Sequence, residues 1–308
     1  MTIFYDGTED MDVKMFYVVN AFSNKPFQGN PAGVVLDANK LEENKMQDMA
    51  RQLNLVETVF VYNPTVTDKY DFELRYFTPL KEVPIAGHPT IATFIALEVA
   101  GRININQKQK YVIKTKAGLR EIRMHKDNGE TVVTMQSPKP IFYPEIKDRY
   151  EVAEVLGLRL EDLIPDLPVQ PVDTGLGHLI VPVRSMDALM KVERNINPLR
   201  HLCSRFNMRE AQVFTFETYE KKKDIHTRNI CPREGIEDPA CGLGNAALGA
   251  YLLKNKYPKK KEILLKSEQG KIINMPCVIS IHASKVEDDM QILVGGKGRV
   301  MIKGEFYI

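Results

Sequence analysis

Two segments of the chain are apolar at almost every position and have the length of a helix. Residues 89–100 place isoleucine, alanine, phenylalanine and leucine on nearly every helical face, and residues 245–256 do the same with alanine, leucine and tyrosine. A helix that is apolar all round is buried all round. Because proline is common at the first position of a helix, we predict two central buried helices over these ranges, the first one starting at Pro89.

Short segments rich in β-branched and aromatic residues lie between turn residues on both sides of these helices, which is typical of strands. Short turns favour antiparallel pairing, because a parallel pair needs a long crossover. An amphipathic pattern over residues 41–53 predicts a helix, and we expect two peripheral helices over 150–158 and 197–206. The predicted strands cover residues 14–20, 33–36, 57–62, 72–77, 110–114, 118–125, 131–136, 178–183, 212–217, 224–229, 262–266, 277–282 and 291–294.

The first half of the chain recurs in the second half. Four segments match in the same order, each 152 to 155 residues further along. Self-similarity with a period of half the chain indicates two copies of one domain rather than a solenoid. The matched segments are 57–60 with 210–214, 75–79 with 228–232, 86–97 with 241–253, and 114–118 with 266–270.

The predicted fold is therefore α+β, with two similar domains related by a pseudo-twofold axis. Each domain is expected to be a curved, mostly antiparallel sheet around one central buried helix. We interpret residues 1–13 as an N-terminal extension, 14–137 as the first domain and 138–308 as the second, with the option that the last strand returns to the first domain. Two related halves leave a cleft between them, which is a favoured place for a ligand.

Composition and charge exclude several classes of protein. The chain has 42 lysines and arginines against 40 acidic residues, a formal charge of +2, which is too small to predict a nucleic-acid partner. No stretch approaches the roughly 18 apolar residues of a membrane span, and the acidic N-terminus lacks the apolar core of a signal peptide, so we expect a cytoplasmic protein. The four cysteines have no C-x-x-C spacing, which argues against a zinc site or a disulfide framework.

The starts of the two buried helices are the first candidates for a site. Helix starts present free backbone N–H groups and the positive end of the helix dipole. Two starts that face one cleft would bind a carboxylate, or stabilise negative charge that forms on a substrate. The alternative is that both motifs are only glycine turns that lead into core helices. The candidate substrate-binding residues are Gly87, Pro89, Cys241 and Gly242.

Two side chains of the first half carry the candidate chemistry. Glu57 stands between an amphipathic helix and an apolar strand, where partial desolvation would raise its pKa toward the range useful for proton transfer; the alternative is an exposed strand-edge glutamate. Its repeat counterpart Glu210 has a more polar setting and is interpreted as solvated. His88 stands at a helix start and can donate to a substrate oxygen, unless it is a capping or core histidine. His178, after a glycine turn, is a weaker candidate.

One further motif matches a dinucleotide-binding pattern in spacing but not in the residues that precede it. Gly242, Gly244 and Ala247 match the spacing of the dinucleotide fingerprint G-x-G-x-x-A. That fingerprint follows an apolar parallel strand, whereas Glu237, Asp238 and Pro239 precede this one. We therefore expect no dinucleotide cofactor.

Several segments together resemble the phenazine-biosynthesis isomerase family, often called PhzF-like, over nearly the whole chain from about residue 14. The matching segments are 20–22, 27–32, 54–58, 76–79 with 82, 87–90, 237–240 with 242, and 268–270. The resemblance implies the two-domain fold of diaminopimelate epimerase and proline racemase, with the site between the domains. It also implies a homodimer and an isomerase that moves a proton on a small cyclic carboxylate, without metal or organic cofactor. The family's catalytic glutamate falls on Glu57, and its supporting histidine and aspartate fall on His88 and Asp238.

The chain departs from the family at the second helix start. A serine of the family aligns with Leu243, and its usual threonine with Cys241. In the related epimerases two cysteines act as acid and base; Cys241 occupies the second of those places, but Ala86 occupies the first. Two alternatives therefore stay open beside the isomerase, namely a metabolite-binding protein without turnover and an epimerase that uses Cys241 alone.

Overall fold

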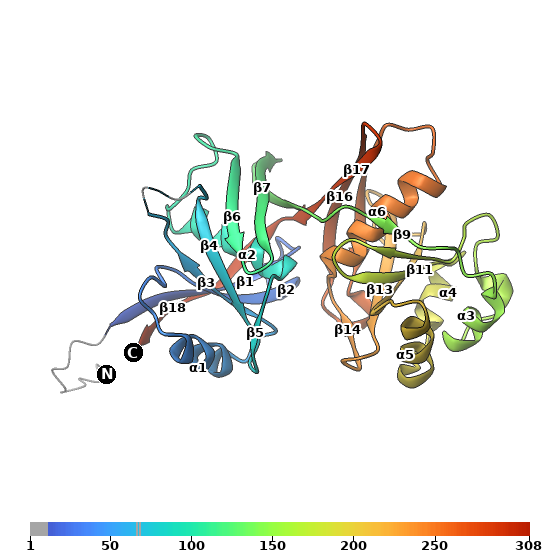
Figure 1. Ribbon diagram of the computed structural model, residues 1–308, viewed down its shortest axis with the longest axis horizontal. Helices are drawn as coiled ribbons and strands as arrows, with labels where there is room; N and C mark the ends of the chain where they lie inside the picture. Colours follow the sequence, from blue (N-terminus) through green and yellow to red (C-terminus); the bar gives the residue numbers. More distant parts are fainter. Residues whose placement is uncertain (1–11, 66, 68) are drawn as a thin grey trace.

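The protein consists of two lobes that lie side by side along its long axis in the computed structural model, which describes residues 12–65, 67 and 69–308 (Figure 1). Each lobe contains strands wrapped around one central helix, α2 (Gly87–Val99) in the first and α6 (Gly242–Asn255) in the second. The predicted α+β fold with two similar, mostly antiparallel halves is confirmed. The predicted extension over residues 1–13 lies largely outside the described residues, and Val13 already belongs to the first strand.

The first lobe takes its strands from the beginning of the chain and from its last strand. Besides α2 it contains the surface helix α1 (Glu43–Leu53), close to the predicted range. Its strands are β1 (Val13–Ala21), β2 (Asn30–Val35), β3 (Thr58–Tyr62), β4 (Phe72–Phe77), β5 (Glu82–Val83), β6 (Lys110–Thr115), β7 (Gly118–Asp127), β8 (Glu130–Gln136) and β18 (Gly298–Tyr307).

The second lobe repeats this plan and adds peripheral helices. These are α3 (Arg149–Val155), α4 (Met186–Lys191) and α5 (Ile196–Arg205), with two short 3₁₀ helices at Leu160–Asp162 and Lys271–Ile273. Its strands are β9 (Ile141–Phe142), β10 (Gln170–Asp173), β11 (Gly177–Pro182), β12 (Glu210–Thr215), β13 (Ile225–Cys231), β14 (Ile236–Asp238), β15 (Glu262–Gln269), β16 (Cys277–Val286) and β17 (Asp289–Gly296).

Strand pairing confirms the internal duplication. In the first lobe β2 runs parallel to β3, β3 antiparallel to β4, and β4 parallel to β6. In the second lobe β11, β12, β13 and β15 repeat this succession of parallel, antiparallel and parallel pairs. The helix of each lobe follows a short strand, β5 or β14, that pairs with β4 or β13. The two sites at these helix starts are therefore topologically equivalent.

An ion pair recurs at the same place in both lobes. Arg75 on β4 donates two hydrogen bonds to Glu82 on β5, at 2.8 and 2.7 Å. Arg228 on β13 donates two hydrogen bonds to Glu237 on β14, at 3.0 and 2.9 Å. A bidentate arginine–carboxylate pair fixes geometry as well as charge, so each pair fastens the strand that leads into the central helix.

Both central helices are buried, as predicted, but they begin earlier than their apolar pattern. The first helix starts at Gly87, so Pro89 is its third residue and not its first. The second starts at Gly242, three residues before the predicted Asn245. A proline fits anywhere in the first helical turn, because the N–H that it lacks has no partner there. The polar or glycine residues of the first turn therefore belong to the helices, which places His88 inside one of them.

The lobes are joined by strands as well as by chain connections. Strand β17 of the second lobe pairs antiparallel with β8 of the first, from Leu293 opposite Gln136 to Gly296 opposite Val133. The chain then continues into β18, which pairs along β1 in the first lobe. Within the part of the chain that the structure describes, no helix is both long and apolar enough to cross a membrane.

Candidate active site

Glu57 is held at the junction of α1 and β3. The helix ends at Asn54, which adopts a left-handed conformation with φ of 51° and turns the chain toward the strand. The backbone carbonyl of Glu57 then accepts a hydrogen bond of 3.0 Å from the N–H of Gly33 on β2. These two local features fix the backbone of Glu57, so its side chain projects from a rigid position and is 17% exposed.

His88 is the second residue of α2, and its ring is buried. It hydrogen bonds to the backbone of Pro31; because a proline offers only its carbonyl, the ring is the donor. The Nε2 atom has no hydrogen-bond partner among the described residues, so Nδ1 carries the hydrogen. Burial outweighs the Pro31 contact and lowers the pKa of His88 to about 4, which makes the imidazole neutral at pH 7.

Glu57 and His88 face each other without a hydrogen bond. The distance from Glu57 Oε2 to His88 Nε2 is 3.4 Å, yet both atoms are buried and have no hydrogen-bond partner within the described part of the chain. Burial first, and the charge of Asp238 second, raise the pKa of Glu57 to about 7. A carboxyl group with this pKa is close to half-protonated at neutral pH, the condition that suits both removal and return of a proton.

Asp238 is a residue of the second lobe whose charge acts on Glu57. It ends β14, and its Oδ1 accepts hydrogen bonds from the Ala240 N–H at 2.8 Å and from the Asn30 side chain at 3.4 Å. Burial raises its pKa to about 6, although the bond from Ala240 acts in the opposite direction. Asn30 opens β2 of the first lobe, so this contact joins the lobes beside Glu57.

Glycines open both central helices and leave room there. A Cβ atom added to Gly87 would meet only the Cε of Met135, at 4.0 Å, and one added to Gly242 would meet only a methyl group of Val294, at 3.9 Å. By contrast, a Cβ at Gly244 would lie 2.5 Å from the Gln212 side chain. Both helix starts therefore have open space beside the glycine, where an anionic ligand can approach the free N–H groups.

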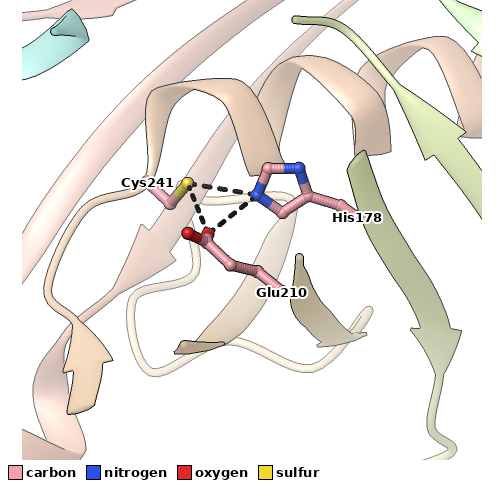
Figure 2. A group of neighbouring side chains, drawn as sticks. All are labelled: His178, Glu210 and Cys241. Atoms are coloured by element: carbon pink, nitrogen blue, oxygen red, sulfur yellow. Dashed lines mark hydrogen bonds and ion pairs between the residues drawn. The ribbon is translucent and has the colours of Figure 1, made fainter. Parts of the chain in front are cut away.

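A second cluster of polar side chains occupies the equivalent place in the second lobe. Figure 2 shows His178, Glu210 and Cys241 pointing toward one another. His178 Nε2 lies 3.0 Å from Glu210 Oε2 and 3.4 Å from Cys241 Sγ. Cys241 caps α6, and its sulfur accepts a hydrogen bond of 3.3 Å from the Gly244 N–H. These three side chains satisfy one another, unlike Glu57 and His88.

The structure therefore brings the predicted residues together in two groups. Glu57, His88 and Asp238 form the first, with Gly87 and Gly242 at the adjacent helix starts, while Cys241 belongs to the second. The interpretation of Glu210 as solvated is wrong, since the residue is 7% exposed and forms the partner of His178. Arg209, the polar residue before Glu210, suggested a solvated setting. Glu210 is buried nevertheless, because strands β11 and β13 lie on either side of β12.

Asn30 is a site residue for which the sequence analysis proposed no role. It is 2% exposed, and its Oδ1 has no hydrogen-bond partner among the described residues. A buried polar atom without a partner is costly unless a ligand or water supplies one. The asparagine opens β2 directly before Pro31, whose carbonyl orients His88, so a polar residue followed by a proline at the start of a strand was the available signal.

A cavity of about 490 Å³ also lies between the lobes, but Glu57, His88 and Asp238 are not among its lining residues. Lysines line it from both lobes, namely Lys25, Lys223, Lys266, Lys271 and Lys297. Gln269 connects it to the candidate site, because this residue lines the cavity and its side chain donates a 2.7 Å hydrogen bond to the backbone carbonyl of Asp238.

Comparison with known proteins gives matches over nearly the whole chain. The sequence model of the phenazine biosynthesis-like protein family matches residues 19–304. The isomerase YfhB of Bacillus subtilis is 31% identical, over 90% of this chain and 92% of its own. The trans-2,3-dihydro-3-hydroxyanthranilate isomerase of Pseudomonas aeruginosa is 28% identical, over 95% of this chain and 99% of its own.

A solved structure supports the same relationship. The phenazine biosynthesis protein of the PhzF family from Bacillus anthracis superposes with a TM-score of 0.87. It is 31% identical, and the match covers 97% of this chain and all of the other. The similarity extends through both lobes, so the relative placement of the two central helices is shared.

Proposed function

The chain belongs to the phenazine biosynthesis-like protein family and is an isomerase, and from this premise we propose that Glu57 is the acid/base group that moves a proton on a small cyclic carboxylate. The observation that supports this role is the buried Glu57 carboxyl group, which has no hydrogen-bond partner among the described residues and a pKa raised to about 7. A carboxylate left unpartnered in a buried position serves chemistry more readily than stability.

In the proposed first step, the Glu57 carboxylate removes a proton from a substrate carbon whose conjugate base is delocalised onto a neighbouring unsaturated or carboxylate group. The C–H bond breaks, its electron pair enters the delocalised system, and Glu57 becomes a neutral acid. In the second step the Glu57 carboxylic acid, whose proton can exchange with solvent because the side chain is 17% exposed, protonates another carbon of the same system. The atoms balance without an external oxidant or reductant, so we expect no cofactor.

His88 orients the substrate by accepting a hydrogen bond. Its Nδ1 hydrogen is committed to the Pro31 carbonyl, and a neutral ring then offers the lone pair of Nε2. This differs from the expectation that His88 donates to a substrate oxygen. A substrate that carries an amino or hydroxyl group next to the reacting carbon would supply the donor.

The helix starts stabilise the charge that develops. Once the proton has moved to Glu57, the substrate carries an additional negative charge, and N–H groups at Gly87 and Gly242 that are already oriented cost no reorganisation. Asp238, with a pKa raised to about 6, is mostly ionised at pH 7, and its charge helps to keep the pKa of Glu57 high. Both lobes therefore contribute to the proposed reaction site.

The test is proton exchange with trans-2,3-dihydro-3-hydroxyanthranilate and with other cyclic carboxylates in heavy water. We expect solvent deuterium at the product carbon with the unaltered protein and none with Glu57→Gln. Full activity of Glu57→Gln would overturn the role of Glu57.

A second candidate function is an epimerase in which Cys241 is the proton donor. The observation that favours it is the contact of the thiol with His178 and Glu210 at 3.4 and 3.6 Å, which gives the sulfur two groups that can exchange its proton. In that case Cys241→Ser would abolish exchange as completely as Glu57→Gln. Exchange that persists in Cys241→Ser would exclude this candidate.

A further inference from the structure

His178, Glu210 and Cys241 meet in a triangle rather than in a chain. In a nucleophilic triad the thiol contacts one nitrogen of the imidazole and the carboxylate contacts the other. Here Glu210 Oε2 and Cys241 Sγ both face Nε2, at 3.0 and 3.4 Å (Figure 2). The other ring nitrogen, Nδ1, lies 2.8 Å from the backbone carbonyl of Leu176. No proton can pass through the ring from sulfur to carboxylate in this arrangement.

The positions of the hydrogens show what a cation would replace at the centre of the triangle. The Leu176 carbonyl can only accept, so Nδ1 carries its hydrogen. The sulfur already accepts from the Gly244 N–H at 3.3 Å. Inside the triangle, Nε2 is hydrogen bonded to Glu210 Oε2 at 3.0 Å and the thiol donates to the same oxygen at 3.6 Å. A cation that replaces the hydrogens held there meets an imidazole nitrogen, a carboxylate oxygen and a sulfur whose lone pairs point toward one centre.

We propose that this triangle is a binding site for one divalent cation of the zinc class, held by His178 Nε2, Glu210 Oε2 and Cys241 Sγ. Ligand bonds of about 2.0–2.3 Å in tetrahedral geometry place such atoms roughly 3.3–3.6 Å apart. The three separations are 3.0, 3.4 and 3.6 Å, so small side-chain shifts suffice to admit the ion. Nitrogen and sulfur ligands select zinc over magnesium or calcium.

The surroundings of the triangle match those of a metal site. The hydrogen bond from Nδ1 to a backbone carbonyl orients the ring and exposes Nε2, as is usual for histidine ligands. All three side chains are buried, and they come from β11, β12 and the cap of α6, which are packed elements rather than loops. The site lies in the second lobe and does not depend on the reaction proposed for Glu57.

The cation must displace the thiol proton. Binding therefore releases protons, and the affinity rises with pH. This dependence distinguishes thiolate coordination from adventitious binding to surface carboxylates, which are already ionised.

The experiment is a titration of the untagged full chain with Zn²⁺ against a chromophoric chelator, and with Co²⁺ monitored by absorption. We expect one ion per chain and a sulfur-to-cobalt charge-transfer band. Cys241→Ser should lose the band and bind Zn²⁺ more weakly, by more than the roughly 10–100-fold typical of losing a group that only supports a ligand. The matched control is Cys277→Ser, because that buried thiol donates to the Met275 carbonyl and a hydroxyl group can do the same.

Two results would overturn the proposal: no charge-transfer band with the unaltered chain, or equal Zn²⁺ affinity in Cys241→Ser and the unaltered chain. Glu210→Gln provides a second ligand variant in case Cys241→Ser fails to fold, and it should keep the band but lose affinity. None of these measurements uses catalytic activity, so they are independent of the isomerase proposal.

Discussion

The same position in the two lobes carries a glutamate in opposite electrostatic states. Glu57 immediately precedes β3, and Glu210 is the first residue of β12. Glu57 lacks a hydrogen-bond partner among the described residues, and its pKa is raised to about 7. Burial would also raise the pKa of Glu210, but the hydrogen bond and charge of His178 outweigh it and lower that pKa.

The difference shows how a duplicated scaffold can separate reactivity from stability. In the second lobe His178 lies on β11, directly opposite Glu210 in the parallel register. In the first lobe the corresponding position beside Glu57 is Ala32 on β2, one residue before the Gly33–Thr58 pair. The absence of a side-chain partner at Ala32 leaves Glu57 free to bind a proton, whereas His178 keeps Glu210 ionised.

The largest expected effect is on activity. Glu57→Gln should lower kcat by roughly 10²–10⁴-fold, the usual contribution of an acid/base group, while Glu210→Gln should lower it much less. Steady-state kinetics with the substrate identified by deuterium exchange measures both. An equal loss in the two variants would show that the lobes share the chemistry and would favour the Cys241 mechanism.

The repeated ion pairs provide the next comparison. Glu237→Gln should cost roughly 3–5 kcal/mol of unfolding free energy, because it leaves Arg228 as an unpaired buried charge. Glu82→Gln should cost only about 1 kcal/mol, since Arg75 is partly exposed and also pairs with Glu43 at 2.6 Å. Urea unfolding measures the two values, and equal costs would contradict the stated difference in burial.

The pH dependence of stability should have opposite signs in the two lobes. Glu57 has a pKa raised from 4.5 to about 7 in the folded state, so its contribution is fully present below pH 4.5 and is lost as the pH rises through 7. This loss is on the order of 3 kcal/mol, and Glu57→Gln should remove it. Glu210 has a lowered pKa, so its contribution is present above its unfolded pKa and is lost as the pH falls.

Urea unfolding of both variants from about pH 2 to about pH 8, a range that covers both carboxyl transitions, measures the two slopes. Each variant should flatten a different limb of the stability profile. If Glu57→Gln left the fall above pH 4.5 unchanged, the raised pKa of Glu57 would be wrong.

The smallest effect concerns the glycines at the helix starts. Gly87→Ala should change the unfolding free energy by no more than about 1 kcal/mol, because its Cβ meets nothing closer than 4.0 Å, yet it should raise KM by filling space meant for a ligand. Gly244→Ala is the contrasting variant and should destabilise by roughly 1–3 kcal/mol. An unchanged KM in Gly87→Ala would show that the substrate lies elsewhere.

The sequence predicted the duplication, both central helices and the desolvated setting of Glu57, because each leaves a local or repeated pattern; the catalytic role of Glu57 stays a prediction. It did not predict the contact of His178 with Glu210 and Cys241, which lie 32 and 63 residues away. Partner identity across parallel strands depends on register, and register is fixed by packing of the whole lobe. For the same reason Glu210 looked solvated although the strands on both sides bury it.

The return of β18 to β1 has a mechanical consequence. Asp12 and Ile308 exchange two backbone hydrogen bonds of 3.0 Å, so both residues lie in the first lobe. Within the described residues, the chain leaves this lobe after β8 and re-enters it through β18. The second lobe is thus tethered by two covalent crossings, and a single proteolytic nick in the loop after β8 would not release it. Two connections restrict rotation of one lobe against the other more than a single connection would. We therefore expect the lobes to open for substrate entry by bending about the line that joins the two connections.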